Sequence, residues 1–139
     1  MENRNRTIVL KGKGHHEEGF IQNANGVKPG QPVAFVPGGE RYLDIAPNAT
    51  PRFYIAKEDA LQGKTVDGQY VTNELTFIYK PLPGDHLMVR VAAGTVVTEG
   101  VDCGIVDGLF AVGGTVVGQF VETFDNPPAE ETLAKIRVY

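Results

Sequence analysis

The sequence of 139 residues contains no serine and no tryptophan, and its only cysteine is Cys103. A single cysteine forms no internal disulfide and no multi-cysteine metal site, so the fold must hold by packing, which suits a reducing compartment. The absence of serine removes the usual nucleophile of a Ser-His-Asp triad. The absence of tryptophan weakens the case for a surface that stacks bases.

Long apolar runs and an excess of positive charge are also missing. No segment approaches the roughly 20 apolar residues of a membrane span, and residues 7–10 form an apolar stretch too short for a signal peptide. The 13 basic against 17 acidic residues give a net charge of −4, which offers no field to attract a polyphosphate backbone. We therefore expect an unexported protein with neither a membrane nor a nucleic acid as partner.

Glycine and proline are abundant instead, with 17 and 9 residues in a chain that is still 42% hydrophobic. A helical bundle would not tolerate these residues every few positions, and a disordered chain would lack the apolar residues needed to offset chain entropy. Turn signals separate strand-sized runs at the spacing of a sandwich or barrel. The expected strands cover residues 33–36, 42–45, 52–55, 76–79, 86–92, 95–97, 101–106, 109–112, 115–124 and 134–139.

These patterns predict an all-β fold, a small β-barrel or β-tulip-like domain with at most one or two short helical turns. We assign residues 33–139 to the barrel and residues 1–32 to an extended N-terminal arm and entry loop. One helical turn is expected at residues 57–62, before a glycine at the usual capping position. Within the strand that starts at His86, Leu87, Val89 and Val91 alternate with polar or larger neighbours and should point inward.

The densest polar group is His15, His16, Glu17 and Glu18, all of which are types that bind divalent metals. Neighbouring residues on an extended chain point to opposite sides, so the four side chains cannot converge on one ion. We therefore expect a solvated arm and no metal site here.

No other cluster indicates catalysis. Asp85 and His86 are adjacent at the head of a strand, but most carboxylates lie at turns, where Asp caps its own backbone. Cys103 lies in an apolar strand, which favours a buried, inert thiol. We expect no enzyme and no cofactor.

Several segments carry turn motifs in a particular order, "G-x-(I/V)-x-P-G", "A-x-E-D-x-L-x-G-K", "P-G-D" and "A-A-G … G". They are Gly26-Val27-Lys28-Pro29-Gly30, residues 56–64 with Tyr70 after them, Pro83-Gly84-Asp85 and residues 92–100, followed by residues 121–126 and 136–139. In this order and spacing the chain resembles the head decoration, or capsid cement, proteins of tailed bacteriophages. The resemblance covers most of residues 26–139.

The resemblance implies a barrel or tulip-like domain on the outer surface of an expanded phage head, often present as a homotrimer. It would stabilise the virion by bracing neighbouring major capsid proteins, which are then its partners, and it would carry no catalysis. The protein would be made in the cytoplasm of a host bacterium and end in the virion.

The candidate capsid contact is the short extended stretch of the arm, Thr7, Ile8, Val9 and Leu10. Unpaired backbone groups there could add a strand to the sheet edge of a capsid protein. The alternative is that these residues pair within the barrel. If they form a free arm, a chain that lacks residues 1–14 should still fold.

Two other functions stay open. Residues 93–100 also resemble the "G-x-V-x-x-G" hairpin of biotinyl and lipoyl domains, which implies a carrier or ligand-binding module with Lys64 as the nearest candidate lysine. A small hydrolase that uses Asp85 and His86 is the third possibility, and it depends only on the adjacency of these two residues.

Overall fold

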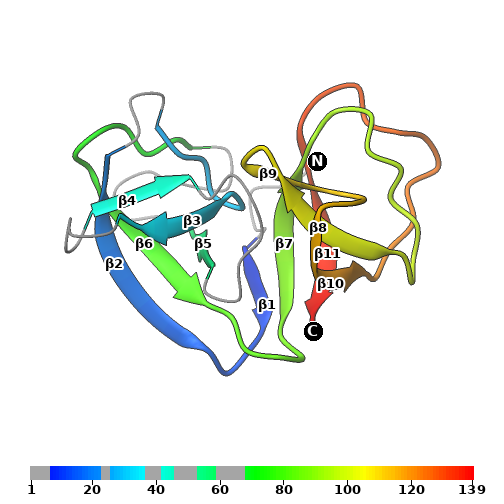
Figure 1. The fold of residues 1–139 in the computed structure, drawn as a ribbon, viewed down its shortest axis with the longest axis horizontal. Coiled ribbons are helices and arrows are strands. Elements are labelled where there is room, and N and C mark those ends of the chain that lie inside the picture. The colour runs from blue at the N-terminus through cyan, green and yellow to red at the C-terminus, as the bar shows by residue number, and fades with distance from the viewer. Residues whose placement is uncertain (1–6, 23–25, 37–41, 46–52, 59–67) are drawn as a thin grey trace.

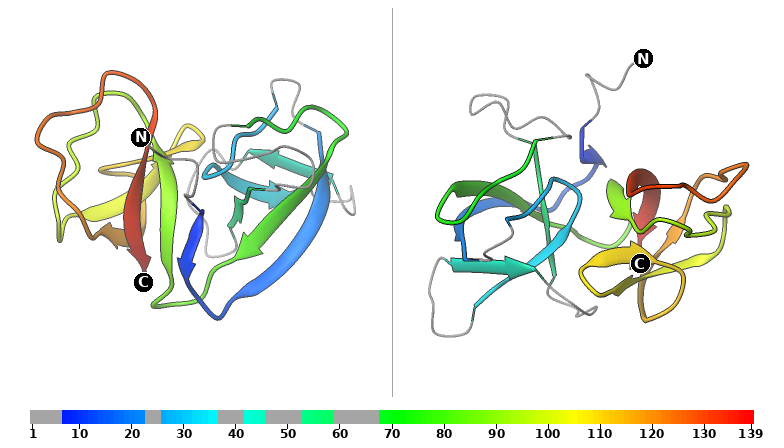
Figure 2. Two further views of the ribbon diagram at one scale, coloured as in Figure 1. Left: turned by 180° about the vertical axis from the view of Figure 1, so that it is seen from behind. Right: turned by 90° about the horizontal axis from the view of Figure 1, so that it is seen from above.

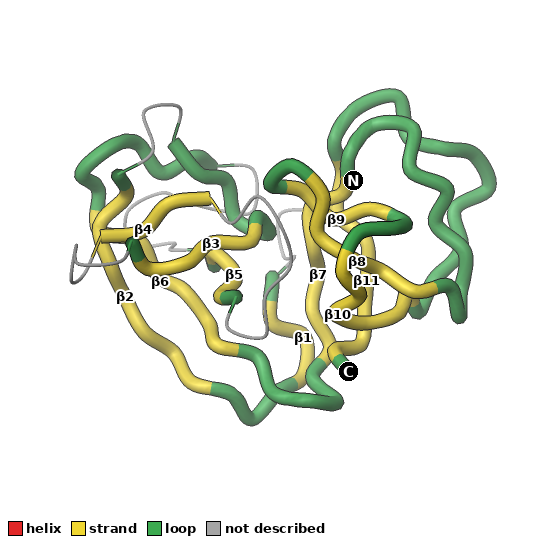
Figure 3. Tube along the Cα trace, viewed as in Figure 1, coloured by secondary structure: helices red, strands yellow, loops and turns green. Residues whose placement is uncertain are grey.

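The computed structural model describes residues 7–22, 26–36, 42–45, 53–58 and 68–139, and within them the chain is all-β with no helix. Figures 1 and 3 show strands joined by turns and loops. The strands are β1 (Val9–Lys11), β2 (His15–Ile21), β3 (Pro32–Phe35), β4 (Tyr42–Ile45), β5 (Tyr54–Ala56), β6 (Leu75–Lys80), β7 (His86–Val91), β8 (Asp102–Val106), β9 (Leu109–Ala111), β10 (Thr115–Phe120) and β11 (Thr132–Val138). The predicted fold class is confirmed.

The strands form two barrels that lie side by side (Figures 1 and 2). The N-terminal barrel closes in the order β2-β4-β3-β5-β6. The C-terminal barrel has the order β7-β11-β10-β8-β9 and closes because β9 pairs back onto β7. Strand β1 extends this second sheet by pairing with β7, and it lies at the seam between the barrels.

The predicted boundary between an arm of residues 1–32 and a domain of residues 33–139 is wrong. Strand β2 pairs with β6 from His15 to Phe20 and with β4 in parallel, so it is an integral part of the N-terminal barrel. The first four side chains of β2 are exposed. A strand whose place depends on backbone pairing to a distant partner, and not on an apolar face, leaves no alternating pattern in the sequence.

Most of the other predicted strands are present within a few residues. Residues 95–97 are an exception, because they lie in a loop and not in a strand. Lys57 and Glu58, the start of the expected helical turn, are not helical, and residues 59–62 lie outside the described part of the chain.

The inward face predicted for β7 is confirmed, since Leu87, Val89 and Val91 are completely buried in the core of the C-terminal barrel. The two outward residues Met88 and Arg90 are nearly as buried. The burial of Arg90 has a different cause, because the N-terminal half of the chain lies against it there and the carbonyl of Pro29 accepts from its Nε.

The seam between the barrels is closely packed. Arg90 donates from its backbone nitrogen to the carbonyl of Gly30 at 2.9 Å and from Nε to the carbonyl of Pro29 at 3.1 Å. Phe53 and Phe110 meet edge to face with ring centroids 6.1 Å apart. Buried side chains of both barrels therefore belong to one core cluster.

Among the described residues, no helix has the length and apolar character needed to span a membrane.

Candidate functional site

The predicted contact stretch, Thr7 to Leu10, is part of the fold and not a free extension, since Thr7 and Ile8 lead directly into β1. Val9 pairs with Leu87 in β7, and the backbone nitrogen of Met88 donates to the carbonyl of Ile8 at 2.7 Å. Ile8 has 0% exposure and belongs to the core cluster at the seam. The alternative that these residues pair within the fold is therefore the observed one.

The start of β1 is also held by a side chain from the N-terminal barrel. One carboxylate oxygen of Glu58 accepts from the hydroxyl of Thr7 at 2.5 Å, and the other accepts from the backbone nitrogen of Ile8 at 3.1 Å. Because both oxygens bind the two residues that precede β1, Glu58 fixes the position where this segment enters the seam.

A groove of about 480 Å³ lies beside β1, on the outer face of β7 and β11. Antiparallel pairing places Met88 beside Lys135 in the floor, since residues opposite each other point to the same side. The groove is lined by Thr7, Leu10, Met88, Glu122, Phe124, Thr132, Leu133 and Lys135. Of the four predicted contact residues, Thr7 and Leu10 reach this groove, and the side chain of Leu10 is 40% exposed.

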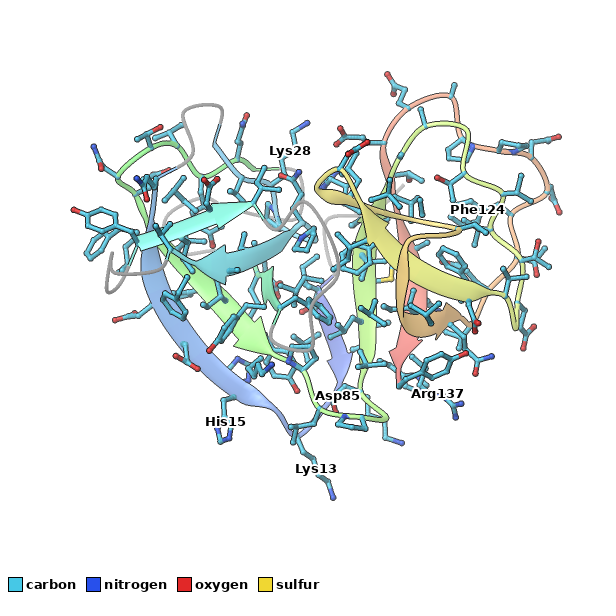
Figure 4. The ribbon with its side chains drawn as sticks, viewed as in Figure 1. Lys13, His15, Lys28, Asp85, Phe124 and Arg137 are labelled. Atoms are coloured by element: carbon cyan, nitrogen blue, oxygen red, sulfur yellow. The ribbon has the colours of Figure 1, made fainter. Side chains whose placement is uncertain are left out.

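The other lining residues were not predicted from the sequence. Met88 was seen only as an outward residue of its strand, and Phe124 only as part of a motif near the end of the chain. Phe124, labelled in Figure 4 among the loops of the C-terminal barrel, packs partly against the core. No local pattern marks these residues, because the groove joins three segments that are far apart in the sequence.

Asp85 is a structural residue at the lower end of the seam, where Figure 4 labels it. Its carboxylate, 5% exposed, accepts from Tyr79 Oη at 2.6 Å, from Leu82 N at 2.9 Å and from Lys13 N at 3.2 Å. Burial opposes the charged form of Asp85, but these hydrogen bonds outweigh it, so the pKa lies below its usual value. Asp85 thus ties the two barrels together as a carboxylate.

The hydroxyl of Tyr79 connects the Asp85 carboxylate to the backbone of Gly14. It accepts from Gly14 N at 2.6 Å while it donates to Asp85. Burial, reinforced by the bond to Asp85, raises the pKa of Tyr79 to about 12. In the described part of the chain no hydrogen bond joins Asp85 to His86, so the pair that the hydrolase hypothesis requires is not formed.

Cys103 has 0% exposure inside the C-terminal barrel, and its predicted burial is confirmed. Burial raises the pKa of its thiol to about 12. A thiol that is neutral near pH 7 and enclosed by apolar side chains is a poor nucleophile.

The residues His15 to Glu18 alternate across β2 as predicted. His16 lies opposite Tyr79 on one side, with ring centroids 4.9 Å apart, while Glu17 lies opposite Ile78 on the other. Lys57 Nζ lies 2.8 Å from His16 Nδ1, and burial followed by this positive charge lowers the pKa of His16. Within the described ranges, no three His, Cys, Asp or Glu side chains are placed to hold a metal ion.

Lys64, the lysine of the carrier hypothesis, lies outside the described residues. The segment that resembles a biotinyl hairpin, residues 93–100, contains no strand and forms a loop with positive φ at Gly94 and Gly100.

Comparison of the chain with protein-family models and with curated proteins finds no match.

Proposed function

We propose that this chain is a structural virion protein that binds the outer surface of an expanded phage head and braces neighbouring major capsid proteins, as a homotrimer. The observation that carries the proposal is the ordered set of turn motifs, from Lys28-Pro29-Gly30 through Pro83-Gly84-Asp85 to residues 92–100. These motifs determine backbone shape, which is what a bracing protein must supply.

The backbone at these motifs supports this interpretation. Gly30, Gly84, Gly94 and Gly100 all have positive φ, between 82° and 94°. Residues with a Cβ rarely adopt this conformation, so glycine is required at each turn for a reason of backbone geometry. The motif glycines thus share one structural role, and none of them needs a ligand to explain it.

Three of the reactive side chains also have structural roles. The carboxylates of Asp85 and Glu58 accept hydrogen bonds that hold strands and linkers, and Cys103 is enclosed in the core. This use of polar groups favours a binding or assembly protein over an enzyme.

Binding to purified heads tests the proposal. The chain is mixed with expanded, undecorated heads, and sedimentation with quantitative gel analysis gives the number of copies bound per head. We expect saturation at a fixed stoichiometry, a multiple of three copies per bound site, and a higher temperature of head rupture. Heads that already carry their decoration protein are the control, since their sites are occupied. No binding between about 20 and 200 mM salt would reject the function, because weak surface contacts are strongest at low salt.

A further inference from the structure

We propose that His16 is a pH-sensitive switch, and that a proton on its ring releases the hold of Glu58 on the segment that enters β1. Two sets of contacts carry the proposal. His16 meets Lys57, and the next residue, Glu58, binds Thr7 and Ile8. All of these contacts lie within one chain, so the switch does not depend on binding to a capsid.

The contact between His16 and Lys57 requires a neutral ring. Lys57 Nζ lies 2.8 Å from His16 Nδ1. Because an ammonium group can only donate, Nδ1 is the acceptor, and the neutral ring carries its proton on Nε2. A second proton must therefore go to Nδ1, where it faces the ammonium group. The contact then changes from a hydrogen bond into a repulsion between two positive charges.

The charge on the ring also acts on Glu58. Burial, followed by the positive charge of Lys57, lowers the pKa of His16, and the negative charge of Glu58 opposes this. Protonation of His16 therefore repels Lys57 and attracts the residue after it. A carboxylate that is drawn toward the ring leaves the hydroxyl of Thr7 and the backbone nitrogen of Ile8.

The backbone around Lys57 is held, so the side chains and β1 must respond. The backbone nitrogen of Lys57 donates to Phe77 O at 2.8 Å, and its carbonyl accepts from Tyr70 Oη at 2.7 Å. A surface hollow of about 460 Å³ beside His16 and Lys57 gives the displaced ammonium group access to solvent. Strand β1 has only three residues and an irregular register with β7, so it frays readily once the bonds at its entry are lost.

Ionisable groups also face the ring from two strands. From β6, the ring of Tyr79 lies 4.9 Å from that of His16 between centroids, and its hydroxyl binds the Asp85 carboxylate. From β2, Glu18 lies two residues further along and therefore on the same side as His16. The pKa of Tyr79 is raised to about 12 and that of Asp85 is lowered, so neither changes charge between pH 7.5 and 5. Histidine is the side chain whose ordinary pKa falls in this range.

NMR spectroscopy of the full chain between pH 7.5 and 5 tests the proposal. The imidazole signals of His16 report its protonation. Hydrogen exchange of the Ile8 amide, corrected for the intrinsic pH dependence of exchange, reports its bond to Glu58. We expect the protection factor of Ile8 to fall about three- to tenfold, the ratio that loss of one hydrogen bond usually produces. The fall should begin near pH 6.5, the ordinary pKa of histidine, and end below the lowered pKa of His16, while the buried amide of Ile136 in β11 keeps its protection.

Variants separate His16 from the other titrating groups. His16→Asn keeps an acceptor that takes up no proton, so the protection of Ile8 should stay constant over the whole range. His15→Asn is the matched control, because His15 is also exposed on β2 but points to the opposite side, and it should keep the wild-type pH dependence. Lys57→Met removes the repulsion and should raise the pKa of His16. Thermal melting at pH 7.5 verifies that each variant is folded.

The proposal is overturned if His16 takes up its proton and the protection of Ile8 does not change, because Lys57 alone then moves and Glu58 keeps its bonds. It is also overturned if His16→Asn retains the pH dependence, since another group then titrates. A parallel loss of protection at Ile136 would overturn it as well, because the C-terminal barrel would then open as a whole.

Discussion

Replacing Ile8 with alanine tests whether β1 is part of the folded core. The side chain has 0% exposure and packs in the cluster that includes Phe53 and Ile55 from the N-terminal barrel and Leu87 from the C-terminal one. Burial of an isoleucine is worth about 1.5–3 kcal/mol. The substitution also leaves a cavity, and buried Ile→Ala changes cost about 2–5 kcal/mol. Because the seam is enclosed from both sides, we expect a loss of about 3 kcal/mol.

Urea denaturation followed by tyrosine fluorescence measures this loss as a shift of the midpoint with an unchanged slope. With a slope of about 2 kcal/mol per molar urea, the midpoint should fall by about 1.5 M. Leu10→Ala, two residues further along the same segment, is the control. Its side chain is 40% exposed, so its substitution should cost about 1 kcal/mol or less.

Equal midpoints for the Ile8 and Leu10 variants would refute this reasoning and would mean that residues 7–10 form a free arm in solution. The same structure reverses the expectation for a chain that lacks residues 1–14. Such a chain loses Ile8 and the pairing of β1 with β7, so we now expect it to be strongly destabilised.

Four further predictions concern Tyr79, Cys103 and Gly30. Tyr79→Phe removes the 2.6 Å bond to the Asp85 carboxylate and should cost about 2–4 kcal/mol in urea denaturation, whereas Tyr139→Phe at the exposed C-terminus should cost less than about 1 kcal/mol. The folded state raises the pKa of Tyr79 to about 12, so the contribution of Tyr79 to stability should be complete below pH 10 and be lost between pH 10 and 12. Stability should therefore decline less over this range in Tyr79→Phe than in the wild type, and an equal decline in both would contradict this. Cys103 should not react with a thiol reagent at pH 8 until the chain is unfolded, and stoichiometric labelling of folded protein would show that the barrel is open. Gly30→Ala should cost about 1–2 kcal/mol more of unfolding free energy than Gly84→Ala, although both glycines have positive φ. A Cβ at Gly30 would lie 2.9 Å from Leu133 Cδ2, whereas one at Gly84 would meet nothing within 4 Å. Equal melting temperatures of the two variants would count against the packed seam.

The sequence predicted the all-β class and many strands because turn residues and local alternation carry that information. Strand β4 has the predicted bounds, 42–45, and β7 has the predicted inward face. Strand β2 was missed because His15 to Glu18 are exposed and polar, so only pairing with β6 makes them a strand. The division into two barrels was missed for a related reason, since closure depends on pairs such as Val91 with Phe110, which no local pattern reveals.

The candidate site was predicted only in part. The short apolar stretch correctly drew attention to Thr7 and Leu10, which line the groove. The sequence pattern does not distinguish Thr7 and Leu10 from the buried Ile8, because the exposure of each side chain depends on its contact with the N-terminal barrel. The lining residues from Glu122 to Lys135 come from the other end of the chain, and the pairing of β7 with β11 brings them near Met88.

The position of the two connections between the barrels has a mechanical consequence. The chain crosses from one barrel to the other through residues 12–14 and again through residues 81–85, and both crossings meet where Asp85 binds Lys13 and Tyr79 binds Gly14. Both covalent connections therefore lie together at one end of the seam. Arg90 fastens the barrels elsewhere along the seam, to Pro29 and Gly30. A force that pulls the barrels apart would therefore act against the two connections at one end and against the hydrogen bonds of Arg90 elsewhere along the seam.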